Sequence, residues 1–227
     1  MTTTIKSVVG AVLYESDKPL KEALEEAVAE GVSLKFAQLD GAKLAGANLS
    51  RANLQGASLT GANLAEANLA GARLYTARLR HANLSEANLT QASASHAIFA
   101  YANLSEACLR NVSLYGANLL YANLTNANIT YASVNYAIFV PDTLSGATFN
   151  NRTIISAAAL GPLGSRTDNL LAVQTVDGLY FQTGCFLGTK EELLAAVKST
   201  HPGSQHGRDY RLAIDFLEAY LKDRNEN

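Results

Sequence analysis

The chain has few of the residues that mark secreted, membrane or metal-binding proteins. Among its 227 residues are no tryptophan, one methionine and two cysteines. Cys108 and Cys185 give neither a disulfide framework nor the spacing of a zinc site, so we expect a reducing compartment. No apolar run is long enough to cross a bilayer and no apolar segment follows Met1. The sequence therefore predicts a cytoplasmic protein without membrane contact.

Charge is also scarce, and the near balance of positive and negative residues argues against a nucleic-acid-binding protein. Charged residues make up 17% of the chain, with 18 Lys and Arg against 20 Asp and Glu, a formal net charge of -2. A general nucleic-acid binder needs a basic surface that displaces counterions from phosphates. We therefore expect no direct contact with nucleic acid.

Catalytic and cofactor motifs are missing as well. There is no Walker motif, no glycine-rich dinucleotide turn and no His or Cys pair with metal spacing. Cys185 has His201 and His206 downstream, but no Asn or Asp is placed to orient either histidine. A cysteine that closes a strand is more often a small buried apolar residue. The sequence thus predicts a protein that is not an enzyme and that binds no cofactor and no metal.

What the sequence does contain is an uninterrupted five-residue repeat over residues 32–156. The central position of each repeat, from Leu34 to Ile154, is filled 25 times by 18 Leu, 3 Phe, 2 Ile, one Val and Ala94. Two residues earlier, from Ala37 to Ala137, Ala fills 20 of 21 positions. Chance does not produce such columns.

A period of five excludes the common regular structures. On a helix each successive Leu would rotate by about 140°, and on a flat strand every other Leu would point to the opposite face. What remains is a chain that bends once per repeat, with the Leu or Phe and the Ala pointing inward. We expect Leu84, Phe99, Leu104, Phe139 and Phe149 to fill the axis, with Phe99 compensating for the small Ala94.

Three repeats carry a family resemblance: residues 47–51 read Ala-Asn-Leu-Ser-Arg, and residues 82–86 and 102–106 both read Ala-Asn-Leu-Ser-Glu. This pattern resembles the pentapeptide-repeat family over residues 32–156. The resemblance implies an all-β dominated fold, a right-handed quadrilateral β-helix with four repeats per coil and about six coils.

The two ends of the chain depart from the repeat and are expected to cover the open ends of the coil. Residues 1–31 predict a strand or hairpin from Ile5 to Tyr14 and then a helix with Pro19 in its first turn. In residues 157–227 we expect a linker over 157–166, a β-hairpin over 170–186 and two helices, from Thr189 and from Arg208. This module weakly resembles that of pentapeptide-repeat proteins encoded by phages and prophages. It could cap the rod, dimerise or dock onto a larger assembly.

Residues 20 apart should stack on the outside of such a rod, which makes surface columns visible in the sequence. Asn residues form two columns that we interpret as structural ladders. Two other columns are candidate partner-binding surfaces: Glu66, Glu86 and Glu106, and His81, Tyr101 and Tyr121. The acidic column could equally be a solvated corner relieved by Arg110, and the rings could simply stiffen the rod. Tyr75 and Tyr115 lie two coils apart.

Two functions follow as hypotheses. The first is a non-enzymatic scaffold that presents these columns to a protein partner, in the virion if the chain is phage-encoded. Its C-terminal module could also form a homodimer. The second is implied by the family resemblance: some members mimic duplex DNA, bind DNA gyrase and confer quinolone resistance. Residues 31–156 hold eight Lys and Arg against five Asp and Glu. A DNA mimic needs the opposite sign.

Overall fold

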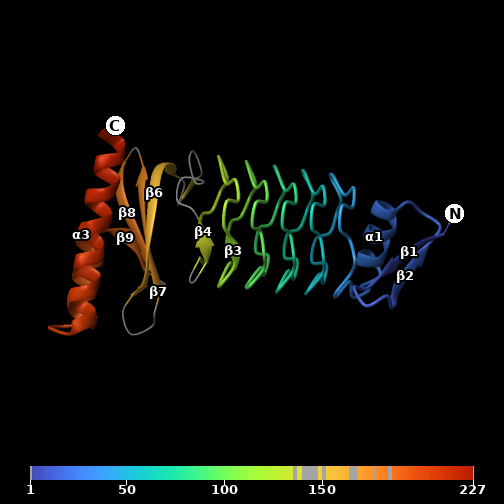
Figure 1. The fold of residues 1–227 in the computed structure, drawn as a ribbon, viewed down its shortest axis with the longest axis horizontal. Coiled ribbons are helices and arrows are strands. Elements are labelled where there is room, and N and C mark those ends of the chain that lie inside the picture. Colours follow the sequence, from blue (N-terminus) through green and yellow to red (C-terminus); the bar gives the residue numbers. More distant parts are fainter. Residues whose placement is uncertain are drawn as a thin grey trace.

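The molecule is a rod with a different structure at each end (Figure 1). The computed structural model describes residues 2–134, 137–139, 148–149, 152–163, 168–175, 177–183 and 186–226. A small N-terminal cap, a stack of coils and a C-terminal module of sheet and helices follow one another along the long axis. No helix within the described ranges is long and apolar enough to span a membrane.

A hydrogen-bonded turn at each corner of the coil explains the period of five. In the repeat around Leu44, the Ala47 N–H donates to the Leu44 carbonyl at 3.0 Å, and Gly46 has a φ of 63°. A positive φ at the third residue of such a turn is the geometry of a type II β-turn. The flat part of the repeat pairs with the next coil, where Leu44 N–H donates to the Asn63 carbonyl at 2.7 Å. Each repeat thus forms one side and one corner.

Four repeats close one coil, as expected. Parallel bridges join residues 20 apart without a break from Gln38 with Ser58 to Ser113 with Ser133. Strands β3 (Asn118–Leu119) and β4 (Ile138–Phe139) continue the same pairing. The backbone is therefore hydrogen-bonded along the rod axis.

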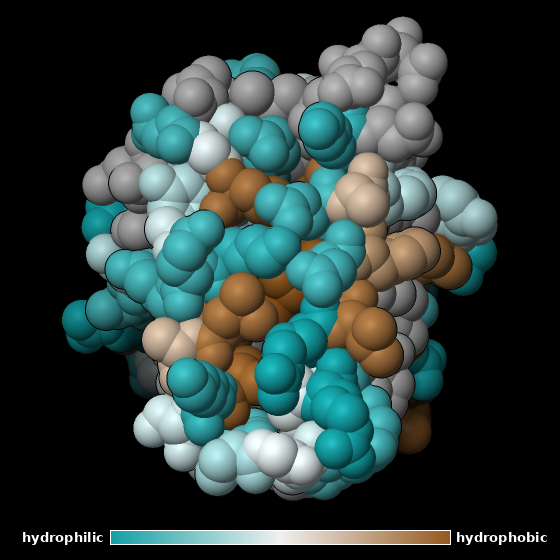
Figure 2. Space-filling view, turned by 90° about the vertical axis from the view of Figure 1, so that its left-hand side faces the viewer, coloured by the Kyte–Doolittle hydropathy of each residue, from teal (hydrophilic) through white to brown (hydrophobic). Residues whose placement is uncertain are grey.

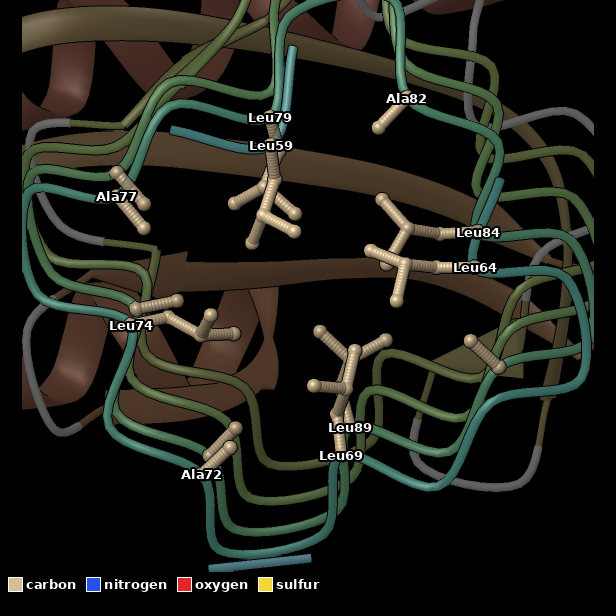
Figure 3. Packing of buried hydrophobic residues seen from close by; sticks show 14 of the residues in the cluster. Leu59, Leu64, Leu69, Ala72, Leu74, Ala77, Leu79, Ala82, Leu84 and Leu89 are labelled. Atoms are coloured by element: carbon tan, nitrogen blue, oxygen red, sulfur yellow. The ribbon is translucent and has the colours of Figure 1, made fainter. Parts of the chain in front are cut away.

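The Leu and Ala columns form one continuous core inside the four sides (Figure 3). Leu84, Phe99 and Leu104 have no exposed surface, which confirms their predicted place in the axis. Ala94 is also fully buried in this cluster, and Phe99 is among the largest fully buried side chains. Phe139 lies in β4 and Phe149 in β5 (Thr148–Phe149), but their predicted burial falls outside the described side chains.

The N-terminal cap closes the first coil. Strands β1 (Thr3–Lys6) and β2 (Val12–Ser16) form the expected antiparallel hairpin. Helix α1 (Leu20–Ala29) buries Ala23, Leu24 and Ala27 in the core of the rod. Pro19 is the residue before the helix rather than a member of its first turn, and it has an extended ψ of 160°.

Polar side chains of α1 also satisfy the open backbone of the first coil. The Lys21 ammonium donates to the Ala45 carbonyl at 2.9 Å, and the Glu25 carboxylate accepts from the Asn48 N–H at 2.8 Å. In later coils the equivalent carbonyl and N–H groups pair with the preceding coil, as the Asn68 N–H does with the Ala47 carbonyl. The first coil has no preceding coil, so the helix side chains take its place. The cap therefore protects both the apolar axis and the exposed strand edge.

The C-terminal module is built on a five-stranded antiparallel sheet. Its strands follow in chain order: β5, β6 (Arg152–Leu163), β7 (Asp168–Thr175), β8 (Gly178–Thr183) and β9 (Phe186–Thr189). The hairpin of β7 and β8 is confirmed. The predicted linker over 157–166 is wrong, because β6 extends through Leu163 and its residues 157–160 pair with β7. Residues 152–156, placed in the rod by the repeat, belong to this strand as well.

Strand β7 connects the rod to the two helices. Leu171 and Val173 lie in the core of the rod, whereas Leu170 and Ala172, on the opposite face, lie in a second core with Phe181. This alternation is the normal period of a strand. One side of the sheet therefore covers the last coil, and the other side carries the helices.

Helices α2 (Lys190–Thr200) and α3 (Gln205–Glu226) pack on the face of the sheet that carries the second core, and Figure 1 shows α3 on the outer side of the sheet. Thr189 and Glu192 form the predicted capping box of α2. The five residues of α3 that the sequence predicts to point inward are all buried: Tyr210, Ala213, Ile214, Leu217 and Leu221.

Candidate interaction surface of the rod

One side of the rod is bordered by both candidate columns. In each coil this side runs from a corner residue, such as His81, through Ala82, Asn83 and Leu84 to the next corner at Glu86. Stacking of coils turns the corners into columns. We call this side the Asn side. It has an aromatic border (His81, Tyr101, Tyr121) and an acidic border (Glu66, Glu86, Glu106).

All six border residues have a backbone conformation that favours glycine. Their φ values lie between 56° and 61°, the values of His81 and Tyr101. Earlier coils have Gly41, Gly46 and Gly61 in the equivalent positions. A side chain there costs about 1 kcal/mol relative to glycine. The six side chains therefore stand outward at strained corners where a smaller residue would be tolerated.

The aromatic border is a continuous stack, as expected. The rings of His81 and Tyr101 lie 5.1 Å apart at 17°, and those of Tyr101 and Tyr121 lie 5.2 Å apart at 23°. The Arg80 guanidinium lies 5.0 Å from the centre of the Tyr101 ring, within the range of a cation–π contact. Tyr101 and Tyr121 remain 44% and 55% exposed. Stacking thus stiffens the column and leaves a large aromatic surface in solvent.

The acidic border forms no ion pair with the part of the chain that the structure describes. Glu66, Glu86 and Glu106 are exposed. Their N–H groups each bond to the next coil, as Glu66 does to the Ser85 carbonyl. Within the described ranges no Lys, Arg or His nitrogen lies within 4.0 Å of these carboxylates. Arg110, the cation suggested to relieve Glu106, forms no ion pair with it.

The Asn ladder between the two borders serves the rod itself. Asn83 donates through its side-chain amide to the Asn63 Oδ1 at 3.3 Å, and Asn103 and Asn123 repeat this contact at 3.1 Å. Each Oδ1 also accepts a backbone N–H two residues on, such as Ser85 N–H for Asn83. In Asn63, Asn83 and Asn103 the Oδ1 thus accepts two hydrogen bonds, which confirms the structural interpretation.

A third aromatic group, formed by Tyr75, His96 and Tyr115, lies at the corner that precedes the aromatic border. Its ring contacts were not predicted from the sequence. The His96 ring is inserted between Tyr75 and Tyr115, with centroid distances of 5.7 and 5.5 Å and nearly perpendicular rings. A Cβ at Gly116 would lie 2.7 Å from the His96 ring, so the ring packs directly on this glycine. Spacings of 21 residues from Tyr75 to His96 and 19 residues from His96 to Tyr115, close to one coil, were the available signal.

The candidate thiol and histidines of the C-terminal module are only partly described. Cys185 lies outside them. His201 and His206 have ring centroids 6.0 Å apart, and His201 stacks on Tyr210. No cluster of three metal-ligating side chains occurs within the described ranges.

A solenoid of 20-residue coils with Leu inside and turns at every fifth residue defines a class of repeat protein. The profile "Pentapeptide repeats (8 copies)" matches residues 42–80, 77–114 and 107–140. Through these residues the chain belongs to the pentapeptide-repeat family. Members of this family fold as right-handed quadrilateral β-helices, in agreement with the four-sided coil described above.

Several solved pentapeptide-repeat structures are similar to part of this chain. Rfr23 from the cyanobacterium Cyanothece 51142 is 40% identical over 36% of this chain and 56% of its own, with a TM-score of 0.36. AT2G44920 from the Arabidopsis thaliana thylakoid lumen is 30% identical over 42% of this chain and 67% of its own, with a TM-score of 0.29. QnrB1, a plasmid-mediated fluoroquinolone resistance protein, is 18% identical over 50% of this chain and 75% of its own, with a TM-score of 0.23. No curated protein matches this chain.

Proposed function

We propose that the protein is a non-enzymatic scaffold whose Asn side binds a protein partner along the rod axis. The observation that carries the proposal is that an exposed aromatic column and an exposed acidic column border the same side. Both columns repeat at the coil spacing of about 4.8 Å. The partner surface would be elongated, with Lys or Arg facing the acidic border and apolar or aromatic groups facing the rings.

Electrostatics favours such a partner. Two full charges one coil apart repel by about 1 kcal/mol in water, and by more when solvent is displaced. Since no cation of the described chain lies against Glu66, Glu86 or Glu106, a row of basic side chains would remove this repulsion. Charge complementarity of this kind mainly raises the association rate and selects the partner.

Tyrosine on the aromatic border adds apolar contact at a low entropic cost. Tyr101 and Tyr121 are already ordered by stacking, so little side-chain freedom is lost when a partner covers them. Tyrosine is enriched among the residues that dominate interface energies. The aromatic border would therefore supply affinity and the acidic border selectivity.

The test compares three immobilised baits in one host lysate. These are the native protein, a border variant (Glu66→Gln, Glu86→Gln, Glu106→Gln) and a charge-matched control (Glu15→Gln, Glu22→Gln, Glu191→Gln), whose glutamates are exposed elsewhere. We expect a protein that the native and control baits retain and the border variant loses. If no protein distinguishes the border variant, the acidic border binds nothing.

The second hypothesis, inhibition or protection of DNA gyrase, has less support. The count over residues 31–156 gives an excess of three positive charges, which is the wrong sign for a DNA mimic. A supercoiling assay with purified gyrase tests it directly. We expect no effect of the protein on supercoiling, with or without a quinolone.

A further inference from the structure

The outer face of α3 carries an apolar stripe at the end of the molecule. Leu212, Phe216 and Tyr220 are 69%, 55% and 42% exposed, although the opposite face of the same helix is buried in the module. Their spacing of four residues places them in one row about 12 Å long. The Phe216 and Tyr220 rings stack with centroids 6.1 Å apart. Figure 2 shows apolar side chains between polar ones on this end of the molecule.

The charges beside this stripe are separated along the helix. Among the described residues, Arg208 and Arg211 donate to neutral acceptors, the Gly203 and Gly207 carbonyls and the Gln205 side chain, and Asp209 between them accepts from Gln205. One and two turns further on, Asp215 and Glu218 share a single cation, Lys190. The first half of the helix therefore has an excess of positive charge, and the following turns have an excess of negative charge.

We propose that this face of α3 binds the same face of a second copy, with the two helices antiparallel. A two-fold axis near residue 213 places Arg211 of each copy opposite Asp215 of the other, and Arg208 opposite Glu218. Leu212 then lies at the axis and Phe216 packs beside Leu212 of the second copy. An isologous contact of this kind needs a surface whose two halves complement each other, which is the arrangement found here.

The dimer would double the rod. Helix α3 lies at one extreme of the molecule and the N-terminal cap at the other, so the two rods would extend away from a central pair of α3 helices (Figure 1). The dimer would therefore carry two Asn sides, one on each rod. This inference stands on α3 alone and does not depend on what the rod binds.

The first experiment is sedimentation equilibrium of the full chain up to about 100 μM, where a complex with micromolar Kd is nearly complete. We expect twice the monomer mass for the native protein and the monomer mass for Phe216→Glu. Because Phe216 is more than half exposed, its replacement leaves the fold intact, which circular dichroism checks. Val9→Glu, at an 86% exposed apolar residue of the other end, is the control and should remain dimeric. A monomeric native protein, or a dimeric Phe216→Glu variant, would overturn the proposal.

The second experiment tests the antiparallel register. Arg211→Glu places like charges opposite each other across the axis, and Asp215→Lys does the same with the opposite sign. We expect each variant alone to associate at least about tenfold more weakly than the native chain, since two symmetric contacts become repulsive. An equimolar mixture should regain the native affinity as a heterodimer. A mixture that stays as weak as its components refutes the register.

Discussion

The most direct test of the four-sided core is a lysine in its axis, Leu84→Lys. Leu84 has no exposed surface and is surrounded by the Leu and Ala columns (Figure 3). The substitution removes about 1.5–3 kcal/mol of apolar burial. It also places an amine where no acceptor is available, so the amine has to be neutral in the folded state.

The cost of that neutral amine can be worked out. A free lysine has a pKa of about 10.4, and each pH unit below it costs about 1.4 kcal/mol, or about 4–5 kcal/mol at pH 7. The lost apolar burial and the neutral amine together cost about 6–8 kcal/mol, whereas a typical unfolding free energy is about 5–15 kcal/mol. At neutral pH the variant should therefore be unfolded or close to it.

The sign of the pH dependence makes the prediction specific. Because the pKa of the buried amine is lowered in the folded state, the unfolded state binds more protons and stability rises with pH. We expect a recovery of about 1.4 kcal/mol per unit from pH 7 to 10, measured by urea unfolding at each pH. Leu84→Met, of nearly equal volume, and the exposed Glu86→Lys are the controls, and both should lose less than about 1.5 kcal/mol. A Leu84→Lys protein with the native midpoint, or with no pH dependence, would show that Leu84 does not face a dry axis.

Three further predictions follow from the corners and the caps. The pKa of Asp40 is subject to burial, which raises it, but hydrogen bonds from Ser58, Gln38 and Thr60 outweigh burial and lower it. The native protein should therefore be more stable than Asp40→Asn by a constant amount above about pH 5, and this difference should disappear as the pH falls below about 4. Thermal unfolding of both proteins measures the difference. Gly116→Ala should cost about 1–2 kcal/mol from positive φ and more from the His96 ring, and a double-mutant cycle with His96→Ala should recover only the second part. Deletion of 148–227 should expose the last coil and cause aggregation, seen by light scattering; a monodisperse product would mean that the module is no cap.

Much of the rod could be predicted because every repeat has the same local environment. Each central residue from Leu34 to Ile129 is buried in the core and the corners between them turn in the same way, so successive repeats give the same information many times over. The stack of His81, Tyr101 and Tyr121 followed from spacing alone, since it lies within one column. Whether the aromatic and acidic borders of the Asn side bind a partner stays a prediction.

The Tyr75, His96 and Tyr115 group shows where this reasoning stops. These residues belong to two columns, so their contact depends on side-chain directions at a corner, and the sequence period contains no such direction. The strained corners themselves were readable, because Gly41, Gly46 and Gly61 precede the border residues in the same columns. Glycine in some coils is the signal for positive φ in all of them.

The prediction of a linker at strand β6 was wrong for a different reason. Gly161 and Pro162 are strong local signals for a loop, and the preceding run of alanines is a weak strand former. What makes this segment a strand is its partner: Ala157 pairs with Val173 and Leu160 with Leu170, on a strand whose alternate residues are buried on both faces. The irregularity that Gly161 and Pro162 cause is confined to a register shift between Leu160 and Leu163. A strand decided by a distant partner cannot be recognised from its own residues, so the module that covers the rod was the part of the fold least accessible to the sequence.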